Sequence, residues 1–105
     1  MEITFRSASL RTACNSDRKG LRKFGAARFR ILKRRLDQLT AADSLSDVPP
    51  SARCHELKGD RAGQLAVMLD GGWRLVFEPF ADPGGAMDWS KITIIEIVEV
   101  TNYHD

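Results

Sequence analysis

The sequence predicts an α+β domain, in which an antiparallel sheet has two N-terminal helices packed on one of its faces. Three observations support this prediction. Apolar residues recur at helical spacing in the first half of the chain, a proline pair follows at Pro49 and Pro50, and the later segments alternate as strands do. The 105 residues suffice for one ordinary domain with one hydrophobic core, and we expect residues 1–105 to form it.

Two successive helices are expected before the proline pair. The first begins near Asp17 and stops at Gly25, because aspartate favours a helix start and glycine favours a helix end. The second covers residues 26–42, where apolar side chains at spacings of three and four form one stripe. This stripe consists of Phe29, Leu32, Leu36 and Leu39. Ahead of both helices, residues 2–6 alternate polar and apolar side chains and predict a short opening strand.

A hairpin and a final strand are expected after the proline pair. Apolar side chains alternate through residues 64–70 and again through 73–77, and the glycine pair between these ranges suits a tight turn. Residues 79–90 are polar and rich in proline and glycine, which predicts an exposed loop. Residues 92–100 are apolar and β-branched enough for a central strand. With the helices on one face, the other face of the sheet stays available for function.

The net charge of +2 conceals a strong asymmetry along the chain. Residues 1–35 carry eleven Lys or Arg and two acids, a balance of +9, whereas residues 36–105 carry five Lys or Arg and twelve acids, a balance of −7. Such a basic segment is either a solvated helical face or a surface that binds a polyanion. The residues expected to form this basic surface are Arg18, Lys19, Arg22, Lys23, Arg30, Lys33 and Arg34.

Other features of the composition argue against several classes of protein. Cys14 and Cys54 lie far apart without a CxxC pairing, so we expect reduced thiols and neither a disulfide framework nor a metal site. No apolar run near the start is long enough for a signal peptide or a membrane helix. We therefore expect a cytoplasmic protein that has no contact with a membrane and needs no cofactor.

The chain contains two histidines, His55 and His104, and histidine is the side chain best suited to proton transfer near neutral pH. His55 comes just before the expected hairpin and His104 follows the last expected strand. If adjacent strands bring them together, they form an acid–base site at the rim of the sheet. The alternative is that His55 is a surface residue near a turn and His104 belongs to a tail.

Three segments of the chain are informative when they are taken together. Residues 53–64 read RCHELKGDRAGQ, residues 73–77 read WRLVF, and residues 102–104 read NYH. In this order and spacing they resemble HigB-like killer toxins of the RelE/ParE superfamily. Members of that family typically show a His-Pro-Leu-Lys-Gly-Asp segment, a Trp-Arg-Ile strand after a hairpin, and an end close to Asp-Tyr-His. The resemblance covers the chain from about residue 20 onward. The order and spacing of the segments carry it, since each segment alone is weak.

The resemblance implies a RelE-like fold and a role as the toxin of a type II toxin–antitoxin system. It further implies a metal-independent endoribonuclease that cuts mRNA in the decoding site of the ribosome. A helix-turn-helix antitoxin would neutralise the toxin, and operator DNA would be reached only through that antitoxin. The catalytic residues that the resemblance implies are His55, Lys58, Arg74, Tyr103 and His104, and Arg61 joins the residues expected to bind RNA.

Cleavage through the 2′-hydroxyl needs a base, an acid and cations beside the phosphate. On the implied assignment, His55 and His104 divide the proton transfers. Arg74 and Lys58 hold the phosphate, and Tyr103 stacks on a base or positions a histidine. The chain also departs from the family pattern. Glu56 replaces the usual proline, Leu65 stands where an aromatic residue is common, and Asn102 replaces an aspartate whose charge could orient or charge a neighbouring histidine.

Structural explanations compete with some of these assignments. The Lys58-Gly59-Asp60 segment is equally suited to a turn, in which Gly59 supplies backbone freedom. Trp73 shares strand parity with the apolar residues that follow it, which favours packing over base stacking. Two other functions also remain open. The chain is alternatively a ParE-like toxin that binds a protein target such as gyrase, or a non-catalytic module that binds RNA.

Overall fold

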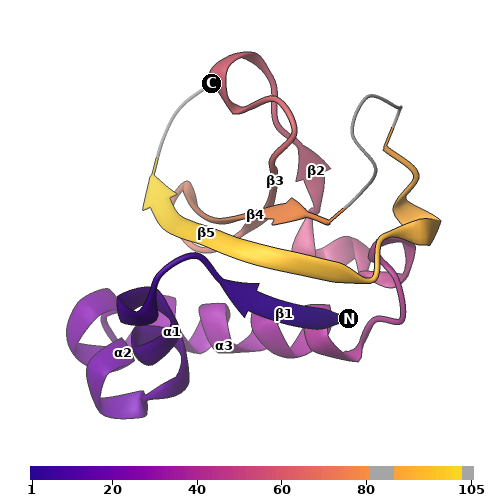
Figure 1. Ribbon diagram of the computed structural model, residues 1–105. Helices are drawn as coiled ribbons and strands as arrows, with labels where there is room; N and C mark the ends of the chain where they lie inside the picture. The colour runs from indigo at the N-terminus through magenta and orange to yellow at the C-terminus, as the bar shows by residue number, and fades with distance from the viewer. Residues whose placement is uncertain (81–86, 103–105) are drawn as a thin grey trace.

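A computed structural model describes residues 1–80 and 87–102 of the chain, as three helices and a five-stranded sheet (Figure 1). The helices are α1 (Ala8–Asn15), α2 (Asp17–Phe24) and α3 (Ala26–Ala41). The strands are β1 (Glu2–Phe5), β2 (His55–Glu56), β3 (Leu65–Met68), β4 (Trp73–Pro79) and β5 (Ile94–Asn102). This is the predicted α+β class. No helix in the described ranges is long and apolar enough to cross a membrane.

The sheet is mixed, with strand order β1-β5-β4-β3-β2. The strands β2 to β5 pair antiparallel, as predicted, but β1 lies parallel to β5, with Glu2 opposite Ile94 and Phe5 opposite Ile97. The expectation of a wholly antiparallel sheet needs this correction. The physical reason is that a parallel neighbour requires a long crossover connection, and the helices and the hairpin between β1 and β5 provide it.

The structure contains one helix more than the two that the sequence predicted, and this additional helix is α1. Its start is marked by Ser7, whose hydroxyl accepts a hydrogen bond from the Leu10 amide at 3.1 Å. Its buried face consists of Leu10, Ala13 and Cys14. Because two of these side chains are small, the helical spacing of the apolar residues is easily missed. The helices α2 and α3 begin at or next to the predicted residues, and Gly25 between them adopts a positive φ of 82°.

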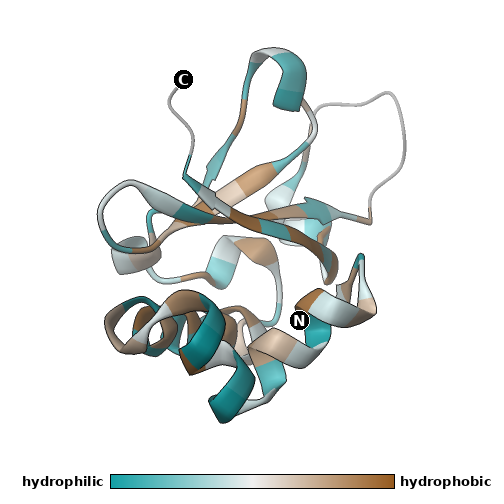
Figure 2. Ribbon diagram, turned by 90° about the vertical axis from the view of Figure 1, so that its left-hand side faces the viewer, coloured by the Kyte–Doolittle hydropathy of each residue, from teal (hydrophilic) through white to brown (hydrophobic). Residues whose placement is uncertain are grey.

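The hydrophobic core lies between the helices and one face of the sheet (Figure 2). Leu32 and Leu39 of α3 are fully buried, as are Leu75 and Phe77 of β4. At this depth each such side chain contributes about 1.5–3 kcal/mol relative to exposure. The core thus fixes the orientation of the sheet and leaves its second face without a helical cover.

Close packing holds α2 against α1 and α3. A Cβ atom added at Gly20 would stand 2.6 Å from the carbonyl oxygen of Ala13 and would also overlap the ring of Phe29. Glycine is therefore required at this helix crossing. The rings of Phe24 and Phe29 lie nearly parallel beside it, with their centroids 6.4 Å apart.

Two arginines of the basic segment attach α3 to the hairpin. The Arg28 guanidinium forms an ion pair with Asp70 at 3.0 Å and lies 4.1 Å from the centroid of the Trp73 ring. Arg35 Nε donates to the carbonyl of Met68 at 2.8 Å. These contacts show Trp73 in a packing role, as its strand parity predicted.

The hairpin of β3 and β4 forms as predicted around Gly71 and Gly72, both at positive φ. The loop predicted at 79–90 is shortened at both ends by regular structure. Strand β4 runs through Pro79, and the short 3₁₀ helix η4 occupies Trp89–Lys91. Residues 81–86 of that loop lie outside the described ranges.

Candidate functional site

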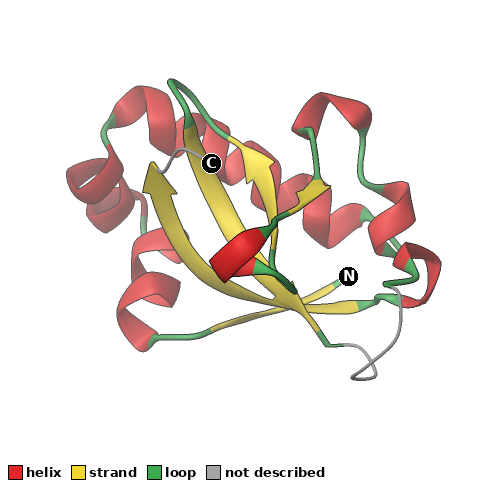
Figure 3. Ribbon diagram, turned by 90° about the horizontal axis from the view of Figure 1, so that it is seen from above, coloured by secondary structure: helices red, strands yellow, loops and turns green. Residues whose placement is uncertain are grey.

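The uncovered face of the sheet carries two of the predicted catalytic residues, His55 and Arg74. His55 in β2 pairs with Ala66, which in turn pairs with Val76. Arg74 pairs with Met68 on one side and with Thr101 on the other. Because direct cross-strand partners share a face and alternate residues along a strand do so too, His55 and Arg74 point to the same side. Figure 3 looks onto this side, which none of the helices α1, α2 and α3 covers.

Strand β2, which carries His55, is not adjacent to β5, the strand that His104 follows in the sequence. Strand β2 lies at one edge of the sheet, and β3 and β4 separate it from β5. Tyr103 and His104, which follow β5 in sequence, lie outside the described residues. Asn102, which the sequence singles out, is the last residue described; it is exposed and pairs with Trp73.

The imidazole of His55 is half-buried and oriented by the backbone. Its Nδ1 atom lies 2.8 Å from the carbonyl oxygen of Arg53. A carbonyl oxygen only accepts hydrogen bonds, so Nδ1 carries the proton in this contact. In the neutral ring Nε2 is then the unprotonated nitrogen that accepts a proton. Arg53 reaches this geometry in a left-handed conformation, with φ at 53°.

Lys58 is exposed and stands at the start of the 3₁₀ turn η3 (Gly59–Arg61), which passes in front of the strands in Figure 3. Gly59 adopts a positive φ of 64°, so the turn explanation of this glycine is correct. Arg61 ends the turn. Its guanidinium pairs with Glu99 of β5 at 2.5 Å and donates to Gln64 at 3.0 Å. The predicted RNA-binding Arg61 is therefore engaged with a carboxylate.

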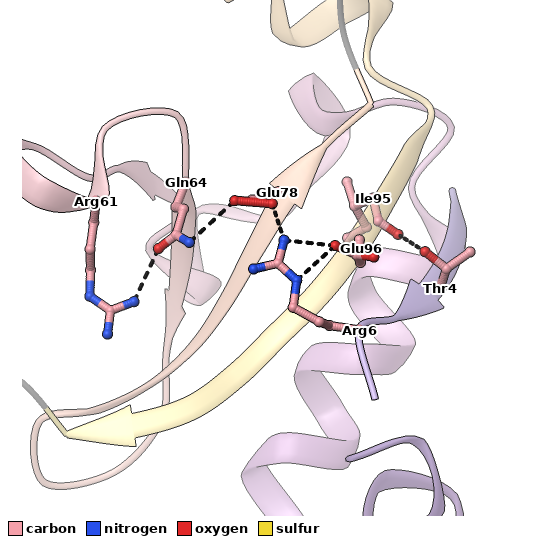
Figure 4. Close-up of polar contacts among 7 residues, drawn as sticks. All are labelled: Thr4, Arg6, Arg61, Gln64, Glu78, Ile95 and Glu96. Atoms are coloured by element: carbon pink, nitrogen blue, oxygen red, sulfur yellow. Dashed lines mark hydrogen bonds and ion pairs between the residues drawn. The ribbon is translucent and has the colours of Figure 1, made fainter. Parts of the chain in front are cut away.

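A chain of polar contacts continues across the uncovered face (Figure 4). Gln64 donates to Glu78 at 3.3 Å, and Glu78 pairs with Arg6. Arg6 also pairs with Glu96 at 2.8 Å, and these hydrogen bonds raise the pKa of its guanidinium, that with Glu96 most and that with Glu78 next. Acidic and basic side chains thus alternate on this face.

The sequence reasoning missed the three glutamates Glu78, Glu96 and Glu99. For Glu78 and Glu96 the signal was present, since each falls on the polar side of an alternating strand. Glu99 has the strand parity of the buried Ile95 and Ile97, so alternation alone does not place it on this face. Beneath the glutamates lies a small apolar cluster of Leu57, Ala66, Val76 and Val98. Strand β5 has a bulge at Val98, because Val76 pairs with Glu99 whereas the next residue, Phe77, pairs with Ile97. The bulge brings Glu99 to the same face of the sheet as Val76.

The basic surface predicted on the helices lies on the opposite side of the molecule. The helices cover the core face of the sheet, and their outer sides face away from it (Figures 1 and 2). All the predicted cations of this surface are exposed: Arg18, Lys19, Arg22, Lys23, Arg30, Lys33 and Arg34. The exposed cations of the helices and the residues His55 and Arg74 therefore lie on different sides of the molecule.

Lys33 differs from the other predicted cations of this surface. Its ammonium group pairs with Asp17 at 2.9 Å, which raises its pKa, chiefly through the hydrogen bond. It also lies 5.6 Å from the centroid of the Phe29 ring. Lys33 consequently links the start of α2 to the middle of α3, and we assign it a structural contact besides any role in binding.

The thiols do not form a reactive site. Burial raises the pKa of Cys14 to about 11 and that of Cys54 to about 12, so both stay protonated near neutral pH. Both are free cysteines, as predicted. Within residues 1–80 and 87–102, no group of three or more His, Cys, Asp or Glu is arranged to hold a metal ion.

Comparison with known proteins supports the fold. No protein-family model and no curated protein matches the sequence. The structure is similar to that of a YoeB/ParE toxin from Agrobacterium tumefaciens, with a TM-score of 0.60 over 99% of this chain and 100% of that chain. The two sequences are 12% identical, a level at which the likeness establishes the fold. The chain therefore has the RelE/ParE-like toxin fold.

Proposed function

We propose that this chain is the toxin of a toxin–antitoxin pair and that it cuts mRNA on the ribosome. The observation that carries the proposal is the position of His55 and Arg74 together on the uncovered face of a toxin-like fold. The HigB-like segments that contain both residues add to it. A helix-turn-helix antitoxin is the proposed partner, and the cytoplasm is the proposed location.

The proposed chemistry is attack of a 2′-hydroxyl on the adjacent phosphorus. His55 accepts the hydroxyl proton at Nε2, because its Nδ1 proton is held by the Arg53 carbonyl. The new O–P bond forms as the bond to the 5′-oxygen breaks. His104 protonates that leaving oxygen, and the products are a 2′,3′-cyclic phosphate and a free 5′-hydroxyl.

Charge that develops on the phosphate needs nearby cations. Arg74 of β4 is proposed to supply the fixed charge, since it belongs to a central strand and is half-buried. Lys58 supplies a mobile charge from the turn η3, and Tyr103 stacks on a base or orients His104. The basic surface of the helices binds ribosomal RNA through its phosphates, on the side of the protein away from the cleavage site.

Expression of the chain without an antitoxin tests the proposal. Growth should stop, and translated messages should be cut at discrete positions that primer extension maps. Purified protein should cut ribosome-bound message much faster than the same RNA free in solution. If messages stay intact in arrested cells, the nuclease proposal fails.

One observation favours a second function, binding to a protein target such as gyrase. Glu78, Glu96 and Glu99 place carboxylates on the uncovered face, where they repel phosphate and suit a protein surface with mixed charge. Under this alternative, growth arrest would come with a DNA-damage response and intact messages. The same expression experiment therefore separates the two functions.

A further inference from the structure

Arg53 has an unusual backbone conformation two residues before His55. Among residues 1–80 and 87–102 it is the one residue other than glycine with a positive φ, at 53°, and its ψ is 48°. These angles fall in the left-handed region, which a Cβ atom disfavours. Such conformations persist where the surrounding structure enforces them, and they cluster at functional sites. The side chain of Arg53 is exposed, so its burial does not explain the conformation.

The segment before Arg53 is fixed to the core. The 3₁₀ helix η2 (Pro50–Ala52) ends at Arg53, whose amide donates to the Pro50 carbonyl at 3.1 Å. Ala52 is 1% exposed and belongs to the hydrophobic core. The ring of Pro50 further restricts the backbone where η2 begins. The chain therefore arrives at Arg53 in a direction that the core determines.

Strand β2, which follows, is fixed as well. The amide of Leu57 donates to the Gln64 carbonyl at 2.9 Å, and the Leu57 side chain is buried. The Glu56 carboxylate accepts a hydrogen bond from the indole Nε1 of Trp89 in η4, at 3.2 Å. The strand that carries His55 is therefore held by β3 through its backbone and by η4 through a side chain.

Because both neighbouring segments are fixed, the backbone angles of Arg53 decide where its carbonyl oxygen lies. In the left-handed conformation the chain passes from η2 into β2 through Arg53 and Cys54 alone. The Arg53 carbonyl oxygen then stands 2.8 Å from Nδ1 of His55. In a neutral histidine, the hydrogen bond made by one ring nitrogen decides which nitrogen carries the proton. A different conformation at Arg53 would move the carbonyl and release Nδ1.

We propose that Arg53 is a positioning residue, whose left-handed backbone holds the imidazole of His55 with its proton on Nδ1. The backbone carries this role, and the guanidinium does not. The consequence for cleavage rests on the proposed function, in which Nε2 of His55 takes the proton of the 2′-hydroxyl. The location of the proton on the ring can be measured without RNA.

Substitutions at residue 53 separate the backbone from the charge. Arg53→Ala removes the guanidinium and keeps an unbranched Cβ, whereas Arg53→Gly removes the steric cost of the left-handed region. Arg53→Val adds a β-branched side chain, for which a positive φ is a strong outlier. All three variants lose the same charge, so they are matched controls for one another. Glycine and alanine should keep the parent geometry, and valine should lose it.

NMR of the full-length chain, isotope-labelled at the ring nitrogens of histidine, reports the tautomer, because protonated and unprotonated nitrogens differ in chemical shift. The measurement is made at about pH 8.5, where an ordinary imidazole is neutral. The His55→Gln variant identifies the signals of His55. In the parent, Arg53→Ala and Arg53→Gly proteins, Nδ1 should carry the proton. In Arg53→Val, the ratio of the Nε2-protonated to the Nδ1-protonated form should rise about five-fold or more.

Cleavage of ribosome-bound message adds a second readout. Under the proposed function, Arg53→Val should slow single-turnover cleavage by about five-fold or more. Arg53→Ala and Arg53→Gly should stay within about two-fold of the parent protein. If the tautomer changes as expected and the rate does not, the positioning role of Arg53 is supported and the catalytic role of His55 fails. The two proposals can therefore be told apart.

Three results would overturn the positioning proposal. One is a parent protein in which neutral His55 carries its proton on Nε2, and this result stands even if Arg53→Val does not fold. Another is loss of the Nδ1-protonated form in Arg53→Ala, which would assign the role to the guanidinium. The third is a parent-like tautomer in folded Arg53→Val. Unchanged amide exchange at the buried Leu65 and Phe77 shows that this variant is folded.

Discussion

The helical layer and the uncovered sheet face hold their charges in different ways. On the helices, Arg22, Arg30 and Arg34 are exposed and form no ion pair among the described residues. On the sheet, Arg6 and Arg61 are each held by glutamates. The same residue type therefore faces water and salt on one side of the molecule and carboxylates on the other.

This difference indicates a division of labour between the two sides. Unpaired surface cations attract a polyanion without fixing its orientation, and the strength of that attraction depends on salt. Paired side chains on a rigid sheet are held in place, which is what a positioned reaction or a specific protein contact requires. Under the proposed function, the helices supply affinity for the ribosome and the sheet supplies the chemistry.

The largest effect is expected at His55. His55→Ala should slow cleavage of ribosome-bound message by about a hundred- to ten-thousand-fold, the usual cost of losing a proton-transfer group. His55→Gln is the matched control, since its amide can still hydrogen-bond the Arg53 carbonyl but transfers no proton. Single-turnover cleavage measures both. If either variant cuts as fast as the parent protein, His55 has no catalytic role and the sheet face loses its assigned function.

A smaller effect is expected from reversing charges on the helices. The combined change Arg22→Glu, Arg30→Glu and Arg34→Glu should weaken co-sedimentation with ribosomes. It should also reduce the slope of log affinity against log salt by about two to three, if each arginine neutralises one phosphate. Lys91→Glu is the control, because Lys91 is exposed but lies in η4, outside the helical layer. An equal effect of the control would show that only net charge matters.

Local sequence signals predicted most of this fold. The helices α2 and α3, the hairpin and β5 all follow from spacing, alternation and glycine positions close to where they form. What could not be predicted is the pairing of β1 with β5, because it joins residues separated by almost the whole chain and no local pattern encodes its parallel direction. The helix α1 was missed for a different reason. Its signal, a serine cap with apolar residues at helical spacing, is present but short.

The candidate site was predictable by residue type but not by arrangement. Alternation along β4 predicts that the side chains of Arg74 and Trp73 lie on opposite faces of the sheet. The observed strand register agrees with this prediction. The sequence could not show that β2 is an edge strand with two strands between it and β5. Nor could it show that Arg61 pairs with Glu99, because the two residues meet only through the strand order and the turn η3. Long-range geometry decided both points.

Two arginines of α3 allow a sharper comparison within the helical layer. Arg28→Ala removes an ion pair with Asp70 and a contact with the Trp73 ring, so it should lower the free energy of unfolding by about 1–2 kcal/mol. Arg30→Ala, two residues away and exposed, should change it by less than about 0.5 kcal/mol. Urea unfolding measures both values. Equal losses would contradict the distinction between anchoring and surface cations.

The smallest effect is expected at Glu99, whose carboxylate pairs with Arg61 on the uncovered face. Its pair with Arg61 is partly exposed, at 42% and 29% of the respective side chains, so solvent screens it and Glu99→Gln should cost at most about 1 kcal/mol of stability. The same change removes a negative charge from the uncovered face and leaves Arg61 without that carboxylate. If RNA binds there, its affinity should rise about two- to five-fold.

Asp43→Asn, an exposed change beyond the end of α3, is the control. Binding of a short RNA, measured by fluorescence anisotropy at two salt concentrations, decides the matter. A gain for Glu99→Gln alone locates RNA on the sheet, whereas weaker or unchanged binding favours a protein target there.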